Sequence, residues 1–258
     1  MQSPEGLGNT FGRAWELLSS NWIMLVPGLV IGIVVFVINF FLIGAGVIGG
    51  AGLGAAGATG MGLSAFGMAA VLATIVGLVG VILTIAYTTG MAGAAWSTGR
   101  ATLDDGAAAF RKDAGSILVA VILLVVLAIV ASFLSVILFF TLGLPLLLFV
   151  LFFLYTFASV IIGGRSGSEA LMDSARVATR NFLTTLLLLV LLCVVFLIAG
   201  LIDRALVQIP MLGGIIAVLI KQIVAVYATL VIVGEYIKLS RTSAVVAAPP
   251  SAGPPATY

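Results

Sequence analysis

The residues of this chain that could bind or move a ligand are a few polar side chains in strongly apolar surroundings. Lys221 and Gln222 lie within an apolar run from about Gly214 to Tyr236. An ammonium group is costly to place in lipid, so Lys221 is by default a candidate for the path of an ion or small molecule. A structural role competes with this, in which Lys221 reaches the lipid headgroups or pairs with Asp203. We favour the structural role.

Other polar residues have simpler interpretations. Asn39 is expected to hydrogen-bond to a neighbouring helix. Asp104 and Asp105 could attract a divalent ion, but two adjacent acids without a further ligand favour the capping of a helix. Glu235 and Lys238 are three residues apart and are expected to pair locally. The chain has no histidine, and no nucleophile and base can be assembled, so the sequence predicts a non-enzymatic protein with neither cofactor nor metal.

A second group of candidates consists of basic residues between the apolar runs. At a membrane surface they would contact anionic lipid headgroups, and the same charges would set the orientation of the chain. These candidates are Arg13, Arg111, Lys112, Arg165, Arg176 and Arg180. The predicted partners are therefore membrane lipids and other membrane protein subunits. No basic block indicates nucleic acid.

The composition places these residues in a membrane. The 258 residues are 62% hydrophobic and 8% charged, with a mean hydropathy of +1.35, whereas soluble domains carry about 25% charged residues. Apolar runs of about 20 residues predict transmembrane helices rather than the short alternating strands of a barrel. The lone Cys193 is expected to be a packing residue. The predicted fold class is an all-α, polytopic helical membrane protein.

Six spans are expected. The first follows a mostly polar segment and is too long for a signal peptide, so we expect it to be retained. Gly44–Leu63 is either an apolar loop, which we favour, or a glycine-rich extension of a helix that packs on its neighbour. The spans lie at about Trp22–Gly44, Ala65–Thr88, Ile117–Phe140, Leu144–Ile162, Phe182–Leu201 and Gly214–Tyr236.

A short amphipathic helix is predicted before spans one, three and five, so that helix plus two spans recurs at about 9–88, 104–162 and 168–236. Phe11–Trp22 and Leu171–Phe182 both end in asparagine followed by an aromatic residue, whereas the middle copy lacks the asparagine. We therefore predict six transmembrane helices as three helical hairpins, each preceded by a short cytoplasmic amphipathic helix. This domain covers 1–239, and 240–258 is predicted to be a disordered Pro/Ala-rich cytoplasmic tail.

The basic residues predict the orientation. With the N-terminus in the cytoplasm, the inner side carries every lysine and arginine except Arg204 and Lys221. Loops rich in lysine and arginine stay on the cytoplasmic side. The predicted location is a bacterial or archaeal cytoplasmic membrane, with both termini in the cytoplasm.

The pattern resembles a known group of proteins. The first helix reads Phe11-x-x-Ala14-Trp15-Glu16-Leu17-Leu18-x-x-Asn21. With the Ala/Arg helices before spans three and five and the inner termini, it is similar to bacterial and archaeal six-span proteins related to the membrane domain of some glycerophosphodiester phosphodiesterases. The resemblance covers about residues 9–240, and no catalytic barrel follows, so no phosphodiesterase activity is expected.

The resemblance implies an inner-membrane protein concerned with lipid or envelope upkeep. Two alternatives remain open. The chain could be an accessory subunit of a larger membrane complex, or a small-molecule or ion transporter that uses Lys221.

Overall fold

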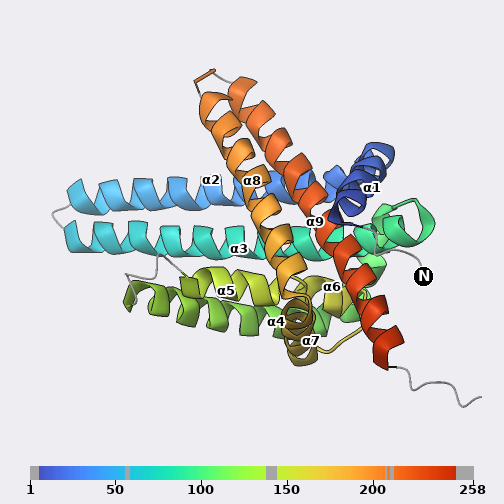
Figure 1. Ribbon diagram of the computed structural model, residues 1–258. Coiled ribbons are helices and arrows are strands. Elements are labelled where there is room, and N and C mark those ends of the chain that lie inside the picture. Colours follow the sequence, from blue (N-terminus) through green and yellow to red (C-terminus); the bar gives the residue numbers. More distant parts are fainter. Residues whose placement is uncertain (1–5, 56–58, 138–143, 207, 210–211, 248–258) are drawn as a thin grey trace, which may run out of the picture.

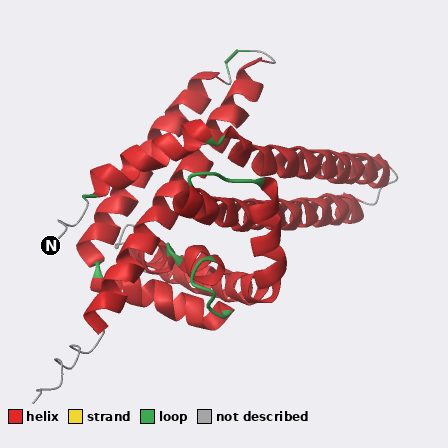
Figure 2. Ribbon diagram, turned by 90° about the vertical axis from the view of Figure 1, so that its right-hand side faces the viewer, coloured by secondary structure: helices red, strands yellow, loops and turns green. Residues whose placement is uncertain are grey.

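The computed structural model describes residues 6–55, 59–137, 144–206, 208–209 and 212–247, and the regular structure in these ranges is helical (Figure 1, Figure 2). In chain order the elements are α1 (Leu7–Ser20), the 3-10 turn η1 (Trp22–Leu25), α2 (Val26–Ala55), α3 (Thr59–Thr98), α4 (Leu103–Ile137), α5 (Leu144–Phe153), α6 (Thr156–Ile161), α7 (Gly167–Arg180), α8 (Phe182–Leu206) and α9 (Leu212–Ala247).

Six helical stretches in the described residues are long and apolar enough to cross a bilayer, so the chain has the make-up of a multi-pass integral membrane protein. They are Trp22–Ile48, Gly67–Thr98, Leu103–Ser135, Leu144–Ile161, Phe182–Leu206 and Gly213–Ser240. This confirms the all-α class and the six apolar spans. Lipid offers no water to pair with the backbone, whereas a helix satisfies its own backbone hydrogen bonds. Long aliphatic runs in lipid therefore form helices.

The spans form two sets with different directions. α2 and α3 pack against each other over much of their length, and α4 lies beside α3 and α5. α8 and α9 pack together and cross the direction of α2–α5 at a steep angle (Figure 1). A Cβ placed on Gly80 would lie 2.4 Å from Val35 Cγ2, so this glycine allows α2 and α3 to approach closely.

The glycine-rich segment is largely helical, which corrects the loop that we favoured for Gly44–Leu63. α2 continues to Ala55 and α3 starts at Thr59, while residues 56–58 lie outside the described ranges. Glycine weakens a helix because its backbone loses more conformational entropy on folding than that of any other residue, and in water the unfolded, hydrated backbone is an available alternative. That alternative does not exist in hydrocarbon, where each backbone group must find a partner within the chain.

The fourth span is broken, which corrects the continuous helix expected over Leu144–Ile162. α5 ends at Phe153 and α6 begins at Thr156. The hydroxyl of Ser174, from α7, donates to the Phe152 carbonyl at 2.8 Å and accepts from the Tyr155 backbone N–H at 3.1 Å. A side chain distant in sequence therefore satisfies the backbone groups that the break releases.

Two asparagines end their helices with similar backbone turns. Asn21 ends α1 with φ −131° and ψ 54°, and Asn181 ends α7 with φ −121° and ψ 41°. Each amide donates to the carbonyl four residues earlier, at 2.8 Å for Asn21 and 3.1 Å for Asn181. Asn21 also donates to the Gly99 carbonyl and accepts from Ala101 N, which fixes the turn between α3 and α4.

The middle copy of the predicted repeat, at 104–162, has no such turn. α4 runs without a break from Leu103 to Ile137, so the helix expected before the third span is not a separate element. With no asparagine to turn the chain, the helix continues through Ser116 and Ile117. Its start also differs from expectation: Thr102 precedes the helix, and its backbone N–H and hydroxyl both donate to Asp105.

The C-terminal helix is longer than its predicted span. α9 extends to Ala247, beyond the boundary placed after residue 239. Residues 248–258, which make up the rest of the predicted tail, lie outside the described residues.

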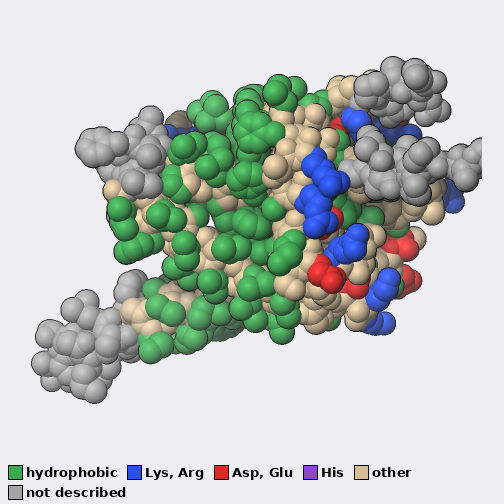
Figure 3. All heavy atoms as spheres, turned by 60° about the horizontal axis from the view of Figure 1, so that its bottom comes forward, with side chains coloured by type: hydrophobic (Ala, Val, Ile, Leu, Met, Phe, Trp, Pro, Cys, Tyr) green, Lys and Arg blue, Asp and Glu red, His purple; other side chains and the backbone are tan. Residues whose placement is uncertain are grey.

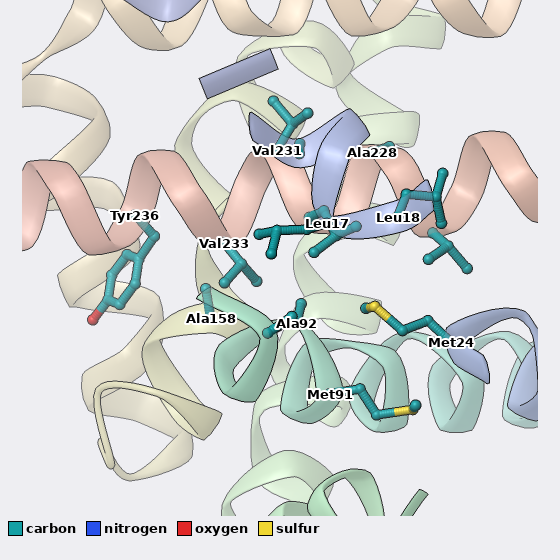
Figure 4. Packing of buried hydrophobic residues seen from close by; sticks show 14 of the residues in the cluster. Leu17, Leu18, Met24, Met91, Ala92, Ala158, Ala228, Val231, Val233 and Tyr236 are labelled. Atoms are coloured by element: carbon teal, nitrogen blue, oxygen red, sulfur yellow. The ribbon is translucent and has the colours of Figure 1, made fainter. Parts of the chain in front are cut away.

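The main hydrophobic core lies where α1, η1, α3, α6 and α9 meet (Figure 4). Leu18, Met24, Met91 and Val231 are among its fully or almost fully buried side chains. By contrast, only 11% of the most apolar window of the first span, and of the second, is buried by the chain. The buried core therefore lies mainly at one end, and α2 and α3, although packed on each other, present long apolar surfaces outward.

We predict that Asn21→Ala destabilises the fold more than Asn181→Ala. Asn21→Ala removes two donated bonds and one accepted bond and leaves the Ala101 N–H without its partner, a loss of about 1–3 kcal/mol of unfolding free energy. Asn181→Ala removes one side-chain hydrogen bond among the described residues, to the carbonyl of Val177 in its own helix. Thermal unfolding of both variants in the same detergent micelles measures the difference. Equal shifts in Tm would contradict the role of Asn21 in joining the end of α1 to the turn between α3 and α4.

Candidate functional site

Charged side chains gather toward one end of the face that Figure 3 shows, and hydrophobic side chains cover most of the rest. We call this the charged end; it holds α7, the start of α4 and the last turns of α3, α6 and α9 (Figure 1). The far end is the end with Asp203, Arg204 and Lys221. The main core lies beside the charged end, so polar groups there are held on closely packed helices.

A pocket of about 500 Å³ opens at the charged end between α7, α9, the α6–α7 link and the last turn of α3. Ile162, Val177 and Ile237 give it an apolar wall. Its charged and polar lining consists of Ser97, Arg165, Asp173, Arg176, Arg180, Tyr236 and Ser240. Pockets of this size hold small ligands or headgroups.

Three arginines dominate the charge of this pocket. Arg176 and Arg180 are one turn apart on α7, and Arg165 precedes the helix in the α6–α7 link. All three are exposed, and none forms an ion pair with the part of the chain that the structure describes. The pocket is therefore lined by three arginines whose guanidinium groups have no carboxylate partner in the described residues.

Asp173 is the acidic residue of the pocket, and one of its oxygens is already occupied. Its Oδ2 accepts from Ser159 Oγ at 2.8 Å and from the Tyr236 hydroxyl at 3.0 Å. Ser159 is on α6, Asp173 on α7 and Tyr236 on α9, so the three helices meet at this carboxylate. These bonds fix α7, and with it Arg176 and Arg180.

The start of α7 is fixed in two further ways. Ser166 and Glu169 form a capping box, in which the Ser166 backbone N–H donates to Glu169 Oε2 at 3.2 Å. The hydrogen bonds from Ser166 lower the pKa of Glu169, and the nearby Arg165 adds to the shift. A Cβ on Gly167 would lie 2.6 Å from the backbone of Ser116 and Ala120, so glycine lets α7 lie directly against α4.

A second polar group is buried beside the pocket. Glu235 on α9 is fully buried; Thr10 Oγ1 donates to its Oε1, and Lys238 Nζ lies 3.2 Å from the same oxygen. The local pair predicted between Glu235 and Lys238 is confirmed. Thr10 is on α1, so the carboxylate ties α1 to α9. A buried carboxylate requires such partners, because burial without them is strongly unfavourable.

The structure brings Lys221 and Asp203 together. Lys221 Nζ lies 2.8 Å from Asp203 Oδ2, and the two side chains are 57% and 26% exposed. This ion pair is the structural role that we favoured for Lys221. Gln222 lies elsewhere, against α2: a Cβ on Gly28 would be 1.7 Å from Gln222 Nε2, and that nitrogen has no hydrogen-bond partner in the described residues.

Among the described residues, the amide oxygen of Asn39 has no partner on a neighbouring helix. This atom, Oδ1, is buried. The side chain lines a hollow between α2 and α3, with Ala69, Ala73 and Thr74. The Thr74 hydroxyl donates instead to the carbonyl of Ala70 in its own helix.

The predicted headgroup residues divide into two groups. The structure gathers Arg165, Arg176 and Arg180 around the pocket. The other three are placed elsewhere: Arg13 lies 5.4 Å from the ring centre of Trp96, and Arg111 and Lys112 are exposed on α4. The Trp96 indole in turn donates to the Leu230 carbonyl at 2.9 Å, which joins α3 to α9.

Sequence reasoning missed Asp173, Ser159 and Tyr236 as one group. Asp173 lies in the amphipathic helix predicted before the fifth span, and the other two lie within predicted spans. A signal was present, because Thr156 and Ser159 place two aliphatic hydroxyls in a span that is otherwise almost wholly apolar, and both residues are fully buried. Hydroxyls at such positions indicate a polar partner on a neighbouring helix.

Comparisons with protein-family models, with curated proteins and with solved structures gave no match to this chain. The pocket and its chemistry are therefore the basis for a functional conclusion.

We predict that the Lys221–Asp203 pair contributes little to stability. A double-mutant cycle of Lys221→Met and Asp203→Asn, measured by unfolding in micelles, should give a coupling energy of about 0.2–1 kcal/mol, because the rest of the chain leaves Lys221 largely uncovered and its long side chain can reach water near the start of α9. A cost of about 3 kcal/mol or more for breaking the pair would indicate a desolvated ion pair instead.

Proposed function

We propose that this chain is a non-enzymatic multi-pass protein of a bacterial or archaeal cytoplasmic membrane that contacts anionic lipid headgroups through its charged end. The observation that carries the proposal is the basic pocket, where Arg165, Arg176 and Arg180 lie together without an ion-pair partner in the described residues. Guanidinium groups at the level of the headgroups bind phosphate oxygens. The apolar spans supply the anchorage.

The distribution of basic residues supports a cytoplasmic charged end. The far end carries Arg204 and Lys221, and the latter is paired with Asp203. The positive-inside rule then places α1, the start of α4 and α7 in the cytoplasm. In this proposal each of these three segments leads into a pair of spans, so that the chain enters the membrane three times from the same side.

A role in lipid or envelope upkeep follows from the same chemistry. The resemblance to six-span proteins related to the glycerophosphodiester phosphodiesterase membrane domain points to the same role. The apolar spans keep the protein in the membrane. In this proposal it binds the headgroups of the inner leaflet and so concentrates anionic lipids around itself, without catalysing a reaction.

The orientation predicts which introduced cysteines are accessible. In a Cys193→Ser background, Gln208→Cys at the far end should react with a membrane-impermeant maleimide on intact cells. Glu16→Cys on α1 should react only after the membrane is opened, because it lies at the charged end. Both positions are exposed. Labelling of Glu16→Cys on intact cells would reverse the orientation and contradict the proposal.

The outward surface of α2 supports a second candidate function, an accessory subunit of a larger membrane complex. Phe36, Phe40 and Phe41 are each more than two-thirds exposed and form one aromatic group. The buried Asn39 Oδ1 close by has no donor in the described residues. Such a surface suits a transmembrane helix of another protein that packs on the rings and donates to the amide oxygen.

The two candidates differ in what is extracted with the protein. Gentle detergent extraction followed by native mass measurement should give the chain with bound lipid alone if the first holds. A stoichiometric second protein that is lost in Phe40→Ala would favour the subunit. Uptake by reconstituted vesicles that Lys221→Ala abolishes would instead favour a transporter.

A further inference from the structure

We propose that the pocket between α7 and α9 is a specific site for the phosphate group of one anionic phospholipid, with Arg165, Arg176 and Arg180 as its ligands. The inference rests on the proposed function in one respect, that the charged end lies at headgroup level. It goes beyond general attraction to an anionic surface, because it assigns a particular pocket, a particular chemical group and a stoichiometry of one lipid.

The charge of the pocket selects an anion. Three arginines and one carboxylate line the pocket, and Asp173 has one oxygen already engaged by Ser159 and Tyr236. Arg176 and Arg180 are exposed on successive turns of a helix whose position is fixed, so they repel each other unless an anion lies between them. The planar fork of arginine matches two oxygens of a phosphate, which a single lysine ammonium does not.

The apolar wall selects a lipid as the source of that phosphate. Ile162, Val177 and Ile237 line the same pocket as the arginines. Free phosphate would leave this wall exposed to water, whereas the glycerol backbone and first methylenes of a lipid would cover it. The pocket also lies where the apolar stretches of α3, α6 and α9 end, at Thr98, Ile161 and Ser240, which is the level of headgroups.

The site is preformed rather than assembled by its ligand. Asp173 is bonded to two helices, and the capping box and Gly167 hold the start of α7 against α4. Little ordering is then required of the backbone when a phosphate binds, which favours affinity. Asp173 has a positioning role: its negative charge keeps the phosphate on the arginine side of the pocket.

Native mass measurement of the full-length protein tests the site. The protein in detergent is titrated with phosphatidylglycerol, phosphatidylcholine or inorganic phosphate, and the population with one bound molecule is followed. We expect saturable binding of one phosphatidylglycerol, with inorganic phosphate weaker by about tenfold or more, the factor that about 1.4 kcal/mol represents, and phosphatidylcholine weaker because its quaternary ammonium adds a positive charge beside the three arginines. Inorganic phosphate bound as tightly as the lipid would overturn the lipid as source.

Paired variants locate the binding. Arg176→Gln with Arg180→Gln should weaken binding of phosphatidylglycerol by about tenfold or more, because charge-assisted bonds to phosphate are lost. Arg100→Gln with Arg204→Gln removes the same charge from exposed positions outside the pocket that are not predicted headgroup residues, and should change binding by less than about twofold. Equal weakening by the two pairs would show non-specific attraction and overturn the pocket.

A conservative pair separates geometry from charge. Arg176→Lys with Arg180→Lys keeps the charge but loses the fork, and we expect weakening close to that of the glutamine pair. Full affinity in the lysine pair would contradict the arginine–phosphate geometry. The arginines are exposed, so unfolding of each variant without lipid should match that of the parent protein. This assay is carried out in detergent and does not depend on orientation, so its failure is distinct from a failure of the cysteine labelling.

Discussion

The packing of other helices around α9 between Val226 and Leu239 is the constraint on which the rest of the structure depends. In this stretch Leu230 accepts from the Trp96 indole of α3, Glu235 accepts from Thr10 of α1, and Tyr236 donates to Asp173 of α7. Gly234 allows the approach, since a Cβ there would lie 2.3 Å from the Trp96 ring. A polar group left unpaired in an apolar region is strongly unfavourable, so each of these bonds selects one arrangement of its helix.

The six apolar helices and the all-α class could be predicted because hydropathy is a local property of the sequence. The matched ends of α1 and α7 could also be anticipated, since Asn21 and Asn181 recur at the same place in their segments. The break between α5 and α6 could not, because it depends on Ser174, a residue of another helix. The helical course of Gly44–Ala55 was misjudged because glycine was weighed by its behaviour in water.

The candidate site was predictable in part for a similar reason. The basic residues of α7 and its preceding link were recognised from type and spacing alone. Their gathering around one pocket depends on how α7 lies against α4, α6 and α9, through Gly167, Ser159 and Tyr236. No pattern within one segment encodes a meeting of three helices. The pairing of Lys221 with Asp203 was easier to anticipate, because the two lie on consecutive helices joined by a short connection.

The concentration of burial at one end has a consequence for how the protein responds to its bilayer. The core where α1, α3, α6 and α9 meet is covered mainly by other parts of the protein. Most of the outward surface of α2 and α3 is instead left to contact lipid acyl chains or a neighbouring protein. Bilayer thickness in the leaflet around the far end therefore acts on two helix pairs, α2–α3 and α8–α9, whose buried packing on other helices lies mainly at the opposite end. A change of lipid there alters the separation of the α2–α3 pair from the α8–α9 pair and leaves the core unchanged.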